Sequence, residues 1–200
     1  MPAIRSFRSA DIDALYAISL ATGFAGSDAS HLYDDPQLMG HIYSAPYALL
    51  EPELSLVVED REGVAGFAVG AIDTPAWEGR LEQEWWPPLR QRYAAPPEAD
   101  KDSWNHDQRR AFMIHHPSRA PAVVVQKYPT HLHMNLLPRL QGHGIGSRLF
   151  EDWLAIAVAR GATAIHVAVN HANARAILFW RKLGFAELVF EGRTIWMGRG

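Results

Sequence analysis

Three polar side chains alternate along one predicted strand and could move a proton. His131, His133 and Asn135 occupy every second position between residues 131 and 137, and they are the candidate catalytic residues. Alternate residues of a strand share one face. Histidine titrates near neutral pH, so His133 or His131 can accept a proton from an amine, directly or through water. Alternatively, both are buried histidines bonded to backbone. No metal site is expected, because a third ligand at fixed spacing is missing.

A glycine-rich turn follows this strand and opens a long amphipathic segment. It reads Gln141-Gly142-His143-Gly144-Ile145-Gly146-Ser147. Free backbone N–H groups and the helix dipole favour an anion at such a position, and glycine has no Cβ to hold a phosphate away. The turn predicts a pyrophosphate site, the alternative being a turn without a ligand. The Rossmann fingerprint does not fit, because Ser147 and Arg148 stand where its third glycine would fall, and no P-loop lysine motif is present.

A second motif lies further along the chain, behind a short apolar strand predicted for Ala164–Val169. It reads Asn173-x-x-Ala176-x-x-Phe179-Trp180-x-x-x-Gly184-Phe185. An ordinary amphipathic helix with a glycine cap explains the apolar residues and the glycine. It does not explain why the helix follows a phosphate turn and a second strand.

Other strands and helices must position these motifs. Residue patterns predict a first strand, two helices, a strand hairpin, the long helix after the glycine turn with Gly161 at its end, and a final hairpin. The remaining predicted ranges are Ala3–Arg8, Asp11–Ala21, Pro36–Tyr43, Leu54–Glu59, Val64–Ala71, Ala186–Phe190 and Thr194–Met197.

The region from residue 73 to residue 123 is rich in tryptophan and proline. Helical pieces are predicted at Ala76–Trp86 and Asn105–His115. One interpretation is a helical pair packed on the sheet, with its tryptophans filling apolar space. The other is a lid or a wall of an acceptor site.

The two motifs together resemble the GNAT superfamily of acyl-CoA-dependent N-acetyltransferases. The family patterns are Gln/Arg-x-x-Gly-x-Gly/Ala and Asn-x-x-Ala-x-x-Phe-Tyr-x-x-x-Gly-Phe, and both occur here in order. Residues 74–97, 115–117 and 128–138 also resemble bacterial stand-alone relatives of the acetyltransferase-like domain of eukaryotic O-GlcNAc hydrolase. The resemblance implies an α/β fold with a central mixed, mostly antiparallel twisted sheet of about six to seven strands. Helices would flank the sheet, with a helical insertion between its third and fourth strands.

The resemblance also implies acetyl-CoA as co-substrate. The pyrophosphate would bind the amides of residues 142–147, and the backbone of Leu136 and Leu137 would pair with the pantetheine arm. One of these two N–H groups would polarise the thioester carbonyl. Asn173 would reach the pantetheine, or cap its helix, or do both. The implied cofactor-binding residues are Leu136, Leu137, Gln141, Gly142, His143, Gly144, Ile145, Gly146, Ser147, Asn173, Ala176, Phe179 and Trp180.

One position departs from the family pattern. Trp180 stands where the family has the tyrosine that protonates the leaving thiolate. An indole N–H has no useful acidity near neutral pH. Either another group protonates the thiolate, or the thiol takes the proton of the acceptor ammonium, or catalysis is weak.

Composition limits the class of protein. The chain has 200 residues, 48% of them hydrophobic and 20% charged, which indicates a folded globular protein. We expect one domain over residues 1–200, with an insertion at about 74–122 and a cofactor-binding core at about 130–185. The net charge of -3, without a basic stripe, argues against nucleic acid. The absence of cysteine excludes disulfides and indicates a reducing cytoplasm. Neither a secretory signal nor a membrane span is expected.

The predicted function is acetyl-CoA-dependent N-acetylation by direct transfer to an amine. The sequence does not specify the acceptor among a small amine, an amino sugar, and a protein lysine or N-terminus. The alternative is an acyl-CoA-binding module or sensor with little or no turnover, which the tryptophan at position 180 motivates. A scaffold that no longer binds CoA is the third reading. The sequence leaves the oligomeric state open.

Overall fold

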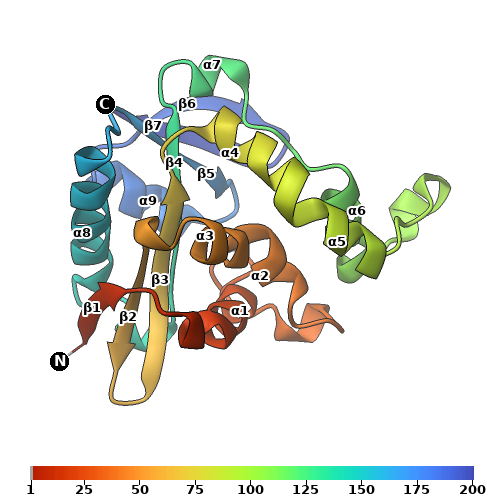
Figure 1. The fold of residues 1–200 in the computed structure, drawn as a ribbon, viewed down its shortest axis with the longest axis horizontal. Coiled ribbons are helices and arrows are strands. Elements are labelled where there is room, and N and C mark those ends of the chain that lie inside the picture. Colours follow the sequence, from red (N-terminus) through yellow and green to blue (C-terminus); the bar gives the residue numbers. More distant parts are fainter. Residues whose placement is uncertain (1) are drawn as a thin grey trace.

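A twisted, open sheet of seven strands organises the protein (Figure 1). The computed structural model describes residues 2–200. The strands lie in the order β1-β2-β3-β4-β5-β7-β6, and every neighbouring pair is antiparallel except β4 and β5. This is the predicted mixed, mostly antiparallel sheet. The strands are β1 Ala3–Ser6, β2 Ser55–Asp60, β3 Gly63–Ala71, β4 Thr130–Leu136, β5 Ile165–Asn170, β6 Ala186–Glu191 and β7 Thr194–Arg199.

The parallel pair is also the shortest contact between neighbouring strands. β4 and β5 pair only at Thr130 with Ile165 and at His131 with His166. Beyond this point β4 stays paired with β3, and β5 stays paired with β7. The sheet therefore opens into a wedge, and an unpaired strand edge leaves backbone N–H and C=O groups free to bind a ligand.

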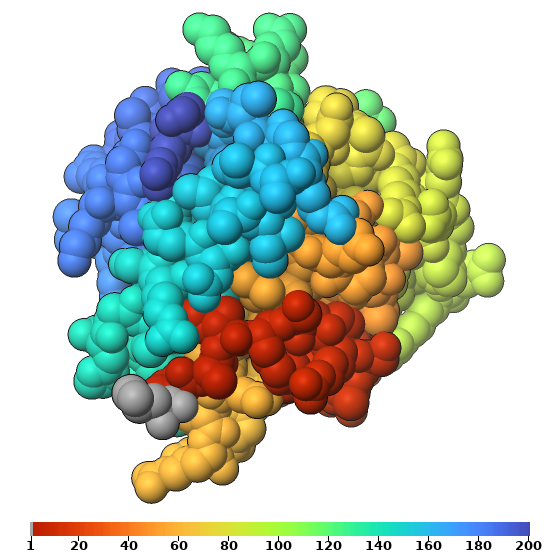
Figure 2. All heavy atoms as spheres, turned by 60° about the vertical axis from the view of Figure 1, so that its left-hand side comes forward, coloured from red at the N-terminus to blue at the C-terminus, as the bar shows by residue number. Residues whose placement is uncertain are grey.

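Helices cover both faces of the sheet. On one face α8 (Ile145–Ala159) and α9 (Ala174–Lys182) share a core with alternate residues of β2, β3 and β4, including Leu56, Ala68 and Leu132. On the other face α1 (Ile12–Ala21), α2 (Leu38–Tyr43) and α3 (Ala45–Leu50) pack on the residues between them, such as Val57 and Phe67. In Figure 2 the face with α8 is turned forward, and the N-terminal segment lies along its lower edge.

A helical insertion separates β3 from β4, as predicted. Its helices are α4 (Thr74–Arg80), α5 (Trp86–Arg92), α6 (His106–His115) and α7 (Ala122–Val125), and a π-helical turn (Leu81–Trp85) joins the first two. The helix predicted to end at residue 86 thus continues to residue 92. Pro87 and Pro88 have no N–H to donate, and the wider turn before them accommodates that loss.

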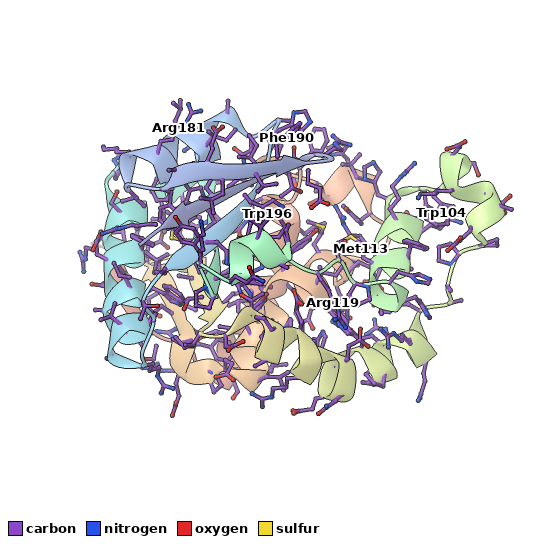
Figure 3. The ribbon with its side chains drawn as sticks, turned by 90° about the horizontal axis from the view of Figure 1, so that it is seen from above. Trp104, Met113, Arg119, Arg181, Phe190 and Trp196 are labelled. Atoms are coloured by element: carbon purple, nitrogen blue, oxygen red, sulfur yellow. The ribbon has the colours of Figure 1, made fainter. Side chains whose placement is uncertain are left out.

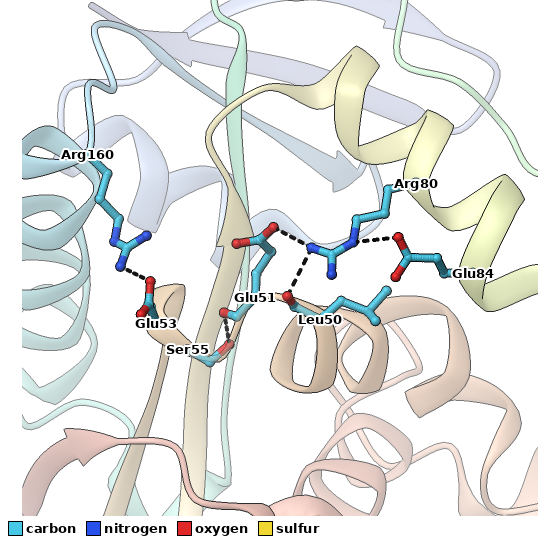
Figure 4. A network of polar contacts seen from close by, with 7 residues as sticks. All are labelled: Leu50, Glu51, Glu53, Ser55, Arg80, Glu84 and Arg160. Carbon is cyan, nitrogen blue, oxygen red and sulfur yellow. Dashed lines mark hydrogen bonds and ion pairs between the residues drawn. The ribbon is translucent and has the colours of Figure 1, made fainter.

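Polar contacts fix the start of the insertion over α3 (Figure 4). Arg80 of α4 donates hydrogen bonds to the Leu50 carbonyl at 3.0 Å, to Glu51 at 2.8 Å and to Glu84 at 3.1 Å. Trp77 and Trp86 pack in the same core as α1–α3. The insertion is therefore held against the sheet on the side where His131 and His133 lie.

The helices before β2 differ from the prediction. The helix expected from Pro36 begins at Leu38, and a further helix, α3, was not predicted. Ser44 interrupts the helical backbone with φ -142°, and Pro46 then starts α3 within its first two positions, where proline is well tolerated. Across residues 2–200, no helix combines the length and apolarity needed to cross a bilayer.

Candidate active site

Two cavities reach the wedge between β4 and β5. The cofactor cavity, of about 600 Å³, is lined by the end of β4, the glycine-rich turn, the first turns of α8 and α9, and residues 22–27. The second cavity, of about 270 Å³, is lined by α2, α3, the insertion, β5, β7 and the first half of β4; we call it the acceptor cavity. His133 lines the acceptor cavity, and the next residue, Met134, lines the cofactor cavity. The two cavities are therefore lined by adjacent stretches of β4.

The glycine-rich turn presents a row of free amides to the cofactor cavity. Within residues 2–200, none of the N–H groups of residues 142–147 has a hydrogen-bond acceptor, and the first amide with a helical partner is that of Arg148. Gly142 and Gly144 have φ of +83° and +76°, where other residues are strained, and a Cβ on either would meet open space. Free amides at the N-terminus of a 15-residue helix suit a pyrophosphate.

Other predicted cofactor residues divide into those that line the cavity and those that do not. Gly146 lines it, but its lack of a side chain also serves packing, since a Cβ there would lie 3.2 Å from the Phe179 ring. Leu137, His143 and Ile145 are not among the residues that line it. The predicted residues that do line the cavity are Leu136, Gln141, Gly142, Gly144, Gly146, Ser147, Asn173, Ala176, Phe179 and Trp180.

Strand β4 distinguishes the two backbone donors that the sequence left open. The Leu137 N–H donates to the Ala65 carbonyl at 2.8 Å, whereas the Thr130 N–H donates toward β5, to Ala164. Hydrogen bonding alternates from side to side along a strand. The amides of Met134 and Leu136 therefore point into the wedge, and the Leu137 amide does not. The Gln141 side chain donates to the Leu136 carbonyl at 2.6 Å and ties the turn to the end of β4.

Two asparagines brace the walls of the cofactor cavity. Asn173 caps α9, since its Oδ1 accepts the Ala176 N–H at 3.0 Å. Its Nδ2 lies against Gly26, where an added Cβ would come within 3.1 Å. Asn135 donates to Thr22 Oγ1 at 2.6 Å. The loop of residues 22–27 is thus part of the cavity wall, which no motif in the sequence indicated.

Trp180 is a packed residue that also lines this cavity. It is 6% exposed, and its ring meets the rings of Phe150, Phe179 and Phe185 edge-on. Among the described residues that line the cofactor cavity, none is a tyrosine, histidine, aspartate or glutamate. The site therefore offers the thiolate no acidic side chain from its own walls.

A hydrogen-bonded chain runs along the floor of the acceptor cavity. Thr74 Oγ1 donates to the Pro129 carbonyl at 2.6 Å and lies 2.7 Å from His131 Nδ1. His131 Nε2 lies 2.8 Å from the Tyr47 hydroxyl, which lies 3.2 Å from His133 Nε2. This hydrogen-bonded chain assembles residues from α3, the insertion and β4, and no motif in the sequence indicated Tyr47 or Thr74 as members.

The carbonyl at the end of this chain fixes its direction. The Pro129 carbonyl can only accept a hydrogen bond, so the Thr74 hydroxyl donates its proton to that carbonyl. The Thr74 oxygen must then accept from His131 Nδ1–H. His131 Nε2 then accepts from Tyr47, and the Tyr47 oxygen accepts from His133 Nε2–H. His133 Nδ1 is left as the unprotonated nitrogen. The tautomers are assigned from this network of partners.

Burial keeps both histidines neutral. Desolvation lowers the pKa of His133 to about 4 and that of His131 well below its usual value, and it raises the pKa of the Tyr47 hydroxyl. Both ring nitrogens of His131 are hydrogen-bonded within the protein. Of the two predicted candidate bases, only His133 therefore has a free lone pair that can accept a proton from a substrate. Nowhere in residues 2–200 do three or more metal-ligating side chains cluster as a metal would require.

The sequence matches the model of one protein family over most of its length. That family is described as "Acetyltransferase (GNAT) family", and the match runs from residue 20 to residue 185. The chain belongs to this family. The resemblance predicted from the two motifs is thereby confirmed.

Curated relatives support the narrower resemblance. The protein O-GlcNAcases of Rattus norvegicus and Mus musculus are each 20% identical over 166 residues, which cover 78% of this chain. The matched region spans only 18% of the length of those proteins. The similarity therefore concerns one part of a much longer chain.

Solved structures share the fold. The crystal structure of SsHAT has a TM-score of 0.91 and 35% identity, covering 99% of this chain and 97% of its own. A putative acetyltransferase from Salmonella typhimurium, yncA, solved with acetyl-CoA, has a TM-score of 0.54 at 18% identity, with 100% and 93% covered. The PaiA N-acetyltransferase of Thermoplasma acidophilum, solved with coenzyme A, has a TM-score of 0.58 at 14% identity, with 100% and 98% covered. At 18% and 14% identity, the similarity to the last two structures shows a shared fold alone.

Proposed function

We propose that this protein is an acetyl-CoA-dependent N-acetyltransferase that transfers the acetyl group directly to an amine. The observation that carries the proposal is the row of free amides at residues 142–147 beside the unpaired edge of β4. The pyrophosphate would lie on those amides and the pantetheine along the edge. Arg175 and Lys182 also line this cavity and add positive charge for the phosphates. The absence of cysteine fits a reducing compartment, and we propose the cytoplasm.

The Leu136 N–H would polarise the thioester carbonyl. It points into the wedge, whereas the Leu137 N–H is used within the sheet. A donor held in place before the reaction stabilises the developing oxyanion by roughly 3–4 kcal/mol. Leu136 is therefore the donor of choice between the two that the sequence offered.

His133 would act as the general base. Its Nδ1 is unprotonated at neutral pH because burial lowers its pKa to about 4. The amine nitrogen attacks the carbonyl carbon, and its proton becomes acidic as the N–C bond forms, so a weak base suffices to take it. The same enclosure lowers the pKa of the bound amine and favours its neutral, nucleophilic form.

The leaving group needs no dedicated acid in this scheme. A thiol has a pKa of about 8.5, so the thiolate is a tolerable leaving group when the C–S bond breaks. The proton taken from the amine passes from His133 to the sulfur, which balances the reaction: amide and CoA thiol from amine and thioester.

A second candidate is an acyl-CoA-binding module with little turnover. Trp180 in place of the family tyrosine, and cofactor-cavity walls that hold no acidic side chain in the described residues, favour it. The two candidates share the cofactor site and differ in whether an amine is acetylated.

Calorimetric titration with acetyl-CoA and with CoA tests the site. Gly144→Glu should weaken binding about 100-fold or more, because it sets a carboxylate against the phosphates. Gly161→Glu is the matched control: Gly161 also has a positive φ, +95°, and open space at its Cβ, but it lies at the other end of α8. Equal losses in both variants, or no binding by the wild type, would overturn the proposal. Acetylation of a panel of amines then separates enzyme from sensor.

A further inference from the structure

The acceptor cavity is walled by aromatic rings. Rings from α2, α3, the insertion and β7 face it, and Trp77 stacks on Tyr47 with 4.5 Å between centroids. Figure 3 shows its surroundings: Met113 of α6, Arg119 of the following loop and Trp196 of β7 come from separate segments, while Trp104 lies far out on the insertion. Broad aromatic walls favour a flat, apolar ligand body. The lining rings are Tyr43, Tyr47, Trp77, Trp86 and Trp196.

Three ring nitrogens in this cavity have no hydrogen-bond partner among the described residues: the indole N–H groups of Trp77 and Trp196, and one nitrogen of His166. His166 of β5 is 2% exposed, and its Nδ1 lies 2.6 Å from the Tyr128 carbonyl. A carbonyl only accepts, so Nδ1 carries the proton and Nε2 is a bare acceptor. Within residues 2–200 nothing donates to Nε2, and His166 lines the cavity. Nε2 therefore offers a lone pair to a ligand, while the two indole N–H groups offer protons, and a hydroxyl group can both donate and accept.

The position of His166 separates this acceptor from the proposed base. The His166 ring lies 5.5 Å from that of His131, which in turn lies 6.0 Å from that of His133. His133 stands next to the wedge, whereas His166 stands at the closed end, where β4 and β5 pair. A ligand whose amine meets His133 would bring its opposite end to His166.

Charged side chains of both signs line the cavity. Glu78 and Glu82 line it together with Arg119, and Glu82 is paired with Arg90. Glu78 accepts the Ala120 N–H and forms no ion pair among the described residues. Arg119 likewise forms no ion pair among the described residues, so the lining carries one unpaired charge of each sign and does not by itself select the charge of the ligand.

We propose that the acceptor is a small, flat amine, such as an aryl-alkylamine, that carries a hydroxyl group donating to His166 Nε2. The inference rests on the proposed function, since it names the amine that the transferase would take. His166 is then a specificity-determining residue. A site built to bond a hydroxyl rejects the analogue without it, because its own polar atom is left unpaired.

Tyramine and phenethylamine are matched probes, because they differ only in the hydroxyl. With saturating acetyl-CoA, kcat/KM for tyramine should exceed that for phenethylamine by about 10-fold to 100-fold. A titration of each amine without acetyl-CoA should show the same preference in Kd. A lysine-containing peptide should be a poor acceptor.

Two substitutions at one position test the role of His166. In His166→Asn the side-chain amide can still donate to the Tyr128 carbonyl, as Nδ1 does, but the acceptor at Nε2 is gone, so the tyramine preference should disappear. In His166→Gln an acceptor oxygen can reach the place of Nε2, so part of the preference should remain. His115→Asn is the control, because His115 also bonds a carbonyl, that of Tyr93, but lies outside the cavity. Acetyl-CoA affinity should stay unchanged in all three.

Failure of this inference differs from failure of the proposed function. If the wild type binds acetyl-CoA and acetylates both amines equally, or acetylates only the peptide, the inference is overturned and the transferase stands. If His166→Asn keeps the preference for tyramine over phenethylamine, His166 does not accept a hydrogen bond from the hydroxyl, and its role is overturned. If the wild type does not bind acetyl-CoA, both proposals fall.

Discussion

The two cavities that share β4 as a wall are built from different parts of the polypeptide. The cofactor cavity presents mainly backbone, from the free amides of residues 142–147 and the unpaired edge of β4. The acceptor cavity presents side chains, from α2, α3, the insertion and three strands. The first should therefore depend on backbone groups that stay free and unobstructed, whereas the second should depend on which side chains line it. One site can thus stay constant while the other is altered by substitution.

The largest expected effect is the loss of one backbone N–H from the cofactor side. Leu136→Pro removes the amide that points into the wedge, and proline is tolerated at a strand edge whose N–H is unpaired. We expect kcat to fall about 100-fold to 1,000-fold while acetyl-CoA still binds. Leu136→Met keeps the amide and should stay within about 3-fold. Steady-state kinetics and calorimetry measure both, and equal rates for the two variants would contradict a backbone role.

Acid should act on the acceptor side first. Burial lowers the pKa of His133 and of His41 to about 4, and also lowers that of His131 and His166. The unfolded chain binds these protons near pH 6.5, so stability is complete above that pH and is lost as pH falls toward 4. At pH 5 each histidine with a pKa near 4 costs about 2 kcal/mol of unfolding free energy.

Urea unfolding at pH 7 and pH 5 measures this cost. His41→Phe should reduce the difference between the two pH values, whereas replacing the exposed His143 with glutamine should leave it unchanged. Carboxylates with lowered pKa values, such as Asp11, contribute only at lower pH. An unfolding free energy that is the same at both pH values would show that these histidines are not buried as described.

A smaller effect is expected from the hydroxyl that holds the base. Tyr47→Phe leaves the ring in place but removes the oxygen that accepts from His133, so His133 is no longer held in one tautomer. We expect kcat to fall about 10-fold, with acetyl-CoA affinity unchanged. Tyr43→Phe is the control, because the Tyr43 ring also lies against His133, at 5.8 Å, while its hydroxyl is not part of the chain. Equal losses would indicate a general effect on packing.

The contrast between the cofactor cavity and the acceptor cavity also explains which parts of the site could be predicted from the sequence. The glycine turn and the helix after Asn173 are contiguous segments whose spacing is visible in the chain, and the structure has both helices where the patterns place them. The Leu136 amide could not be chosen over that of Leu137, because the choice depends on the register of β4 against β3. Tyr47 and Thr74 are 84 and 57 residues from His131, with no periodic pattern to connect them.

The short pairing of β4 with β5 makes the sheet two antiparallel ribbons joined by a seam of two residue pairs. A pantetheine arm that bonds to β4 would extend that seam as a further strand does. Ligand binding and the cohesion of the two ribbons would then be one process. Amide protons on both ribbons should exchange more slowly with acetyl-CoA present, including those far from the phosphates, so the co-substrate would also be a structural element of the fold.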